Sequence, residues 1–136
     1  MKIIRTTNLI PVNAQRTSVL LVKSSLGDGQ AYKWSFPGQV IKKDDNVDEI
    51  ILNISLKTLG TKINKLIKFN LYENKTKNAI VKAQYNIAEI DMAVKLNKDS
   101  RYDKAEWHTL NEEIFFLDFQ YNEKDIITEL IENLNK

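Results

Sequence analysis

The strongest structural signal in this sequence is a helix with a marked beginning and a marked end. Asn46, which follows two aspartates, is a residue type that caps helix N-termini, and acidic side chains come soon after it. An apolar run begins at Val47 and continues toward Gly60, and glycine is typical of the position just beyond a helix. The sequence therefore predicts a helix over residues 47–59.

Segments with strand character lie on both sides of this helix. Residues 17–23 form a short aliphatic run rich in β-branched side chains, which predicts a strand covered on both faces. Residues 63–72 and 79–90 alternate apolar and polar side chains around a polar turn, which predicts an antiparallel hairpin. A short strand is predicted over 105–110, and a helix with one apolar stripe over 125–134.

Charge and residue content exclude several classes of function. Lys and Arg total 20 against 18 Asp and Glu, mixed along the chain, so no long-range field marks a nucleic-acid partner. There is no cysteine and one histidine, His108, which excludes disulfides and both thiolate and multi-histidine metal sites. No apolar run approaches the roughly 20 residues of a membrane span, and the first residues do not resemble a signal peptide. We expect a cytoplasmic protein without a membrane partner.

The segment before the helix carries a resemblance to a known family. Residues 31–41 combine aromatic side chains with a Pro-Gly pair, which predicts strand, sharp turn and strand. Trp34, Pro37 and Gly38, at their distance from Gly60, resemble the Nudix box. That pattern runs Trp-x-x-Pro-Gly-Gly, five residues, Glu, seven residues, and then Arg-Glu-apolar-x-Glu-Glu-x-Gly.

The spacing of the box matches without a gap. Gln39 falls on the second glycine, Asp45 on the first glutamate and Gly60 on the closing glycine. Glu106 and Trp107 resemble a late acidic segment with a tryptophan that Nudix domains carry before a C-terminal helix. The resemblance implies an α/β/α sandwich with a mixed sheet, and the length of 136 residues suits one such domain over 1–136.

Four charged positions of the box are not retained. The Arg-Glu pair falls on Asn53 and Ile54, and the Glu-Glu pair on Lys57 and Thr58. In the family these glutamates hold a divalent metal that neutralises a diphosphate and activates the attacking water. None of the four residues supplies a carboxylate, and Lys57 places a positive charge where Mg²⁺ would sit. We therefore expect no metal and no cofactor at the box.

Displaced acidic side chains are the alternative source of a metal site. Asp45 and Glu49 are neighbours on the predicted helix start, and Glu106, Glu112 and Glu113 lie late in the chain. Acids at a helix N-terminus are ordinary capping residues, and a glutamate in a loop is usually solvated. If these residues held Mg²⁺ or Mn²⁺, the chain would be a hydrolase of a nucleoside diphosphate linked to another group.

The predicted helix has two apolar stripes when its residues are placed at about 100° intervals. The first stripe consists of Val47, Ile50, Ile51 and Ile54, and the second of Leu52, Leu56 and Leu59. A helix on a sheet needs one apolar face, so the second stripe needs cover from the terminal helix or from a second copy in a homodimer. We expect both stripes to be mostly buried.

Together these features favour a Nudix-like domain that is hydrolytically inactive and binds a nucleotide-derived ligand or a protein partner. The candidate ligand-binding residues are the turn residues, one helix lysine and the late glutamate: Trp34, Pro37, Gly38, Gln39, Lys57 and Glu106.

Overall fold

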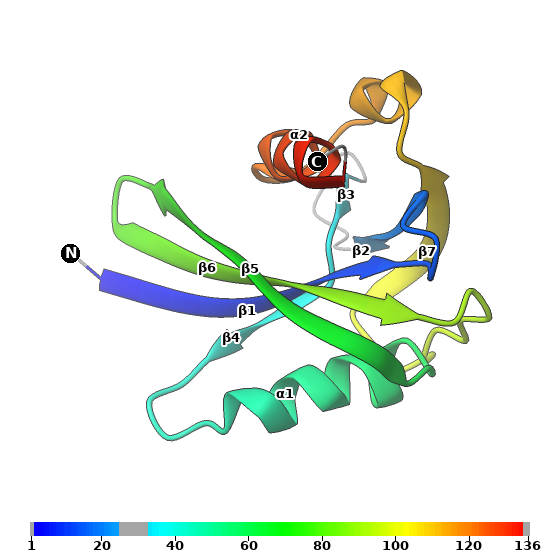
Figure 1. The fold of residues 1–136 in the computed structure, drawn as a ribbon. Helices are drawn as coiled ribbons and strands as arrows, with labels where there is room; N and C mark the ends of the chain where they lie inside the picture. The colour runs from blue at the N-terminus through cyan, green and yellow to red at the C-terminus, as the bar shows by residue number, and fades with distance from the viewer. Residues whose placement is uncertain (1, 25–32, 135–136) are drawn as a thin grey trace.

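A mixed seven-stranded sheet lies between two helices (Figure 1). The computed structural model describes residues 2–24 and 33–134, so the first two residues of the strand-turn-strand segment predicted over 31–41 lie outside the described residues. The strands are β1 (Lys2–Val12), β2 (Ser18–Ser24), β3 (Trp34–Ser35), β4 (Gly38–Ile41), β5 (Ile63–Lys75), β6 (Ala79–Ile90) and β7 (Tyr102–Thr109). The helices are α1 (Val47–Asn53) and α2 (Glu123–Leu134), with a π-helical segment at Ile54–Thr58 and a 3-10 helix at Glu112–Phe116.

The sheet has the order β3-β2-β1-β6-β5, with β4 paired to β1 and β7 paired to β2. β1 and β6 are parallel, and the other pairs are antiparallel. The predicted hairpin is confirmed as β5 and β6, and the strand predicted at 17–23 is confirmed as β2. The four apolar side chains in the middle of β2 are at most 1% exposed, as expected for a strand covered on both faces.

The central strand β1 was not predicted from the sequence. It runs beside β6 over its whole length, and along its other edge it pairs first with β4 and then, at Val12, with β2. β4 and β2 therefore diverge along this edge. The turn at Pro37 lies in the opening between them, where the Leu9 amide donates to the Pro37 carbonyl at 2.9 Å.

Two apolar clusters cover the two faces of the sheet, which confirms the α/β/α architecture. The cluster under α2 contains Ile10, Val12, Val19, Leu21, Trp34, Phe36, Tyr85, Ile87, Ile126, Ile127 and Leu130, among others. The cluster under α1 contains Leu9, Leu20, Val22, Ile50, Ile51, Ile54, Leu59, Ala88, Ile90 and Tyr102. No helix among residues 2–24 and 33–134 is long and apolar enough to cross a bilayer.

The predicted helix over 47–59 is confirmed, and its last turn widens into a π-helix. The Asn46 side chain accepts from the Glu49 amide at 3.2 Å, which caps the N-terminus. At the other end the Leu59 amide donates to the Ile54 carbonyl five residues back, at 3.0 Å. Gly60 then ends the helix at φ 66°, a conformation that glycine adopts without strain.

The expectation that both apolar stripes are buried is wrong for the second stripe. Leu52 and Leu56 are 51% and 55% exposed, whereas Leu59 is 0% exposed. In a π-helix the residue five positions on comes close to alignment with the first, so Leu59 joins the buried side of Ile54. α2 cannot cover the leucines on the outer side of α1, because the two helices lie on opposite faces of the sheet (Figure 1).

Candidate functional site

The turn at Pro37 and Gly38 is held by Arg101, the last residue of the loop before β7, and by Tyr102, the first residue of β7. The Gly38 amide donates to the Tyr102 hydroxyl at 3.0 Å, and the Gly38 carbonyl accepts from Arg101 Nη2 at 2.5 Å. The same Nη2 also donates to the Tyr102 hydroxyl at 2.7 Å. A side chain at position 38 would collide with the Asn8 side chain, so this close approach requires glycine.

The space between this turn and the helix is filled by apolar groups. Tyr102 and Ile54 are 6% and 4% exposed and belong to the same cluster under α1. Ile54 stands at a box position that the resemblance assigns to a metal-binding glutamate. A carboxylate at this position would be surrounded by hydrocarbon, which disfavours its charged form.

The C-terminal end of the helix is surrounded by positive charge. A hollow of about 490 Å³ is lined by Lys57, Lys95, Leu96, Asn97, Lys98 and Asp99. The loop that carries most of these residues caps the helix, because the amides of Lys95 and Asn97 donate to the carbonyls of Leu59 and Thr58 at 3.0 and 2.9 Å. Three ammonium groups against one carboxylate favour an anion here over a divalent cation.

The predicted ligand-binding residues do not form one cluster. Trp34 lies on the α2 face of the sheet, where its ring meets His108 at 4.9 Å between centroids and lies 4.4 Å from Lys23 Nζ. Glu106 lies on the same face, in register with Leu21. Lys57 lies instead on the helix that covers the other face, while Pro37 and Gly38 are buried at the turn between β3 and β4 and Gln39 is exposed beside it.

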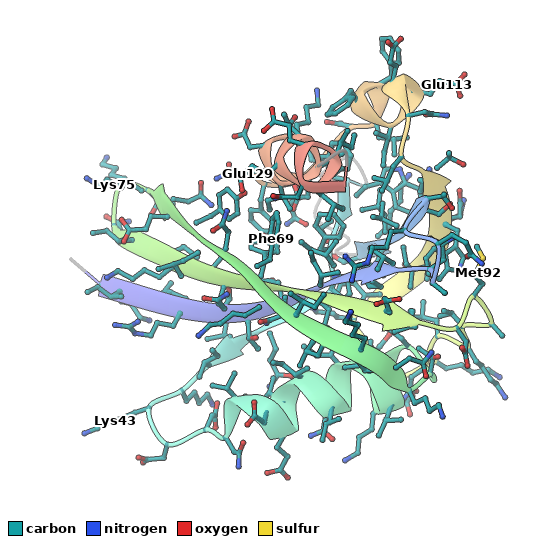
Figure 2. All side chains as sticks on the ribbon, viewed as in Figure 1. Lys43, Phe69, Lys75, Met92, Glu113 and Glu129 are labelled. Atoms are coloured by element: carbon teal, nitrogen blue, oxygen red, sulfur yellow. The ribbon has the colours of Figure 1, made fainter. Side chains whose placement is uncertain are left out.

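The late acidic side chains have ordinary partners or lie elsewhere. Lys104 binds Glu106 at 2.8 Å and holds the pKa of that carboxyl below its usual value, while burial lowers the pKa of His108. Glu112 and Glu113 belong to the 3-10 helix, and Figure 2 shows Glu113 far from the loop of Lys43 that leads into α1. The Asp45 carboxylate accepts from the Lys42 amide at 2.7 Å in that loop.

A divalent metal does not fit the residues of this site. Within residues 2–24 and 33–134, no three side chains of Asp, Glu or His gather into a group that could hold one. The Gly38 carbonyl already accepts from a guanidinium, which would repel an incoming cation.

A second polar feature, which sequence reasoning missed, is the buried Glu123 at the start of α2. Its side chain is 1% exposed, and Oε1 accepts from the Tyr121 amide at 2.6 Å. Oε2 is buried without a hydrogen-bond partner among the described residues. Burial raises the pKa of Glu123 to about 7. In the sequence this residue looks like an ordinary acid of a first helical turn, so no local signal distinguishes it.

Comparison with known proteins places the architecture in one class. The sequence matches no family model and no curated protein. The structure is similar to the MutT protein of Methanosarcina mazei Go1, with a TM-score of 0.80, 16% identity and coverage of 99% of this chain and 97% of that one. It is also similar to the E. coli ORF135 protein, with a TM-score of 0.77, 14% identity and coverage of 99% and 92%.

The structure is also similar to a Nudix hydrolase of Nitrosomonas europaea, with a TM-score of 0.74, 14% identity and coverage of 98% of this chain and 89% of that one. These similarities extend over nearly the whole chain. The chain therefore has the Nudix fold, as the Pro37-Gly38 turn and the spacing to Gly60 predicted.

Proposed function

We propose that this chain is a Nudix-fold domain that binds a nucleotide-derived ligand in the cytoplasm without hydrolysing it. The observation that carries the proposal is the burial of Ile54, which is 4% exposed inside the cluster under α1. A hydrolytic Nudix box needs carboxylates on this part of the helix to hold a metal. Here the corresponding positions carry a packed isoleucine, a lysine and a threonine.

Positive charge at the turn and at the end of the helix supports a phosphorylated ligand. Arg101 lies against Gly38, and Lys57, Lys95 and Lys98 surround the hollow at the end of the helix. Cationic side chains bind phosphate oxygens through charge-assisted hydrogen bonds. Such a site can hold a ligand but does not supply the metal-activated water that hydrolysis requires.

We expect no hydrolysis above a buffer control when the protein is incubated with Mg²⁺ and ADP-ribose, NADH, diadenosine polyphosphates or nucleoside triphosphates. Release of phosphate and of nucleoside monophosphate would be measured for each compound. Turnover near ~1 per second, the low end of ordinary enzymes, would contradict the proposal. A rate that depends on Mg²⁺ or Mn²⁺ and disappears in Glu49→Gln, Glu112→Gln or Glu113→Gln would establish the alternative with displaced ligands.

A protein partner, including a second copy of this chain, is the second candidate. It is favoured by Leu52 and Leu56, which are more than half exposed one turn apart on the outer side of the helix. We expect the double variant Leu52→Lys with Leu56→Lys to have a free energy of unfolding within about 1 kcal/mol of that of the parent, because substitutions at exposed positions cost little stability. Urea unfolding checks this expectation, and a larger loss would mean that the two side chains are buried.

Sedimentation of the parent and of this double variant tests whether the partner is a second copy of the chain. A parent that sediments as a dimer and a variant that sediments as a monomer would support self-association through this face. If parent and variant both sediment as monomers, a second copy of this chain is removed as a partner, and the proposal of ligand binding is not affected.

A further inference from the structure

We propose that Arg101 binds a phosphate group of the ligand and takes the place of a divalent metal at this site. The inference rests on the proposed function, because it concerns how the same ligand is held. A phosphorylated ligand brings negative charge to the turn, and a site without metal must neutralise that charge with side chains. Among the residues that the structure describes, Arg101 is the cation that directly contacts the turn at Gly38.

The guanidinium is held in a defined position before any ligand arrives. Nη2 donates to the Gly38 carbonyl at 2.5 Å and to the Tyr102 hydroxyl at 2.7 Å. The guanidinium carbon also lies 4.9 Å from the centre of the Tyr102 ring, which adds a cation–π contact. A side chain that is already ordered loses less conformational freedom when it binds.

The same guanidinium keeps donors for a ligand. Both anchoring hydrogen bonds use Nη2, so the three N–H groups on Nη1 and Nε make no hydrogen bond to the part of the chain that the structure describes. Arg101 is exposed, and no carboxylate of the described residues lies within ion-pair distance of it. An arginine without a carboxylate partner and with donors facing solvent is suited to an anion.

The surroundings of Arg101 oppose a metal and favour an anion. The loop that ends at Arg101 also carries Lys95 and Lys98, and these two line the hollow with Lys57. A divalent cation at the Gly38 carbonyl would have to displace the guanidinium, whose charge would repel it. Binding should therefore occur in the absence of Mg²⁺.

A purely structural role for Arg101 would be to hold the turn in place. Tyr102→Phe separates this role from ligand binding, because it removes the hydroxyl that contacts the Gly38 amide and keeps the guanidinium charge. Arg16→Gln is the matched control for loss of an arginine, since Arg16, in the turn between β1 and β2, pairs with Glu89 of β6.

The test is calorimetric titration with ADP-ribose and with inorganic pyrophosphate, each in EDTA and in excess Mg²⁺. We expect the parent to bind in EDTA and Arg101→Gln to bind at least about tenfold more weakly, as for loss of a hydrogen bond to a charged group. Arg101→Lys should retain part of the affinity, and the salt dependence of binding should be smaller in Arg101→Gln. Arg16→Gln should leave the affinity unchanged, and Tyr102→Phe should lower it less than Arg101→Gln does.

Two results would overturn the inference and leave the proposed function standing. The first is binding that requires Mg²⁺, and the second is equal affinity of the parent and a folded Arg101→Gln. An equal loss in Tyr102→Phe and Arg101→Gln would reduce Arg101 to a residue that positions the turn. If the parent binds neither probe under any condition while remaining folded, the proposed function fails together with the inference.

Discussion

Ile54→Glu is expected to lower the free energy of unfolding by about 3 to 5 kcal/mol, in the upper range of single substitutions. Ile54 is 4% exposed among aliphatic side chains and Tyr102, so a carboxylate there loses hydration without gaining a partner. The substitution also removes the aliphatic packing of the isoleucine. Urea unfolding at neutral pH measures the loss.

Leu56→Glu is the matched control, because Leu56 lies two positions further along the same segment and is 55% exposed. Its expected cost is within about 0.5 kcal/mol, typical of surface positions. Restoring all three acids, as Ile54→Glu with Lys57→Glu and Thr58→Glu, should also destabilise the fold and create no activity with Mg²⁺. An unchanged thermal melt of that variant, or a gain of Mg²⁺-dependent hydrolysis, would show that this face of the helix is open to solvent.

Glu123 is expected to make the protein less stable as the pH rises from about 4.5 to about 7. Burial raises its pKa in the folded protein from the ordinary 4.5 to about 7, so the unfolded chain releases this proton first. The stabilisation linked to protonated Glu123 is complete below about pH 4.5 and is lost as the pH passes through the folded pKa. A shift of this size corresponds to an upper limit of about 3 kcal/mol.

Glu123→Gln isolates this contribution, because the amide oxygen can still accept from the Tyr121 amide while the titration is removed. The unfolding free energy of the parent and the variant should be compared from about pH 4.5 to about pH 8. His108, whose pKa is lowered by burial, contributes with the opposite sign, and its effect cancels in the difference between the two proteins. Parallel pH profiles for parent and variant would contradict the prediction, because they would mean that folding does not raise the pKa of Glu123.

Local patterns were sufficient for most elements around the site. The cap at Asn46, the glycine at Gly60 and the alternation in β5 and β6 act over a few residues, so the helix and the hairpin can be predicted without knowledge of the fold. The turn at Pro37 and Gly38 has the same local character, and its spacing to Gly60 predicted the Nudix fold.

Local sequence patterns did not predict the strand β1. The part of β1 from Thr6 to Val12 has no regular alternation of apolar and polar side chains, because it lies in the middle of the sheet with both faces covered. It also contains Pro11, a residue type that is unusual inside a sheet. In a strand, the backbone nitrogens of every second residue point toward the same edge. The nitrogen of Pro11 therefore faces the same edge as the Leu9 amide, toward the opening between β4 and β2. The missing N–H of the proline is tolerated because no ladder partner stands at this point of the edge.

By itself the sequence determined which residues of the Nudix box lack a carboxylate and where its helix begins and ends. Only the tertiary structure decided that Ile54 and Leu59 are buried while Leu52 and Leu56 are exposed, because a π-helical turn and a helix on the opposite face are not visible in a 100° projection. Tertiary structure also brought Arg101 to Gly38, which is 63 residues away along the chain. Contacts at such separations depend on how the sheet folds, and no local pattern of residues encodes them.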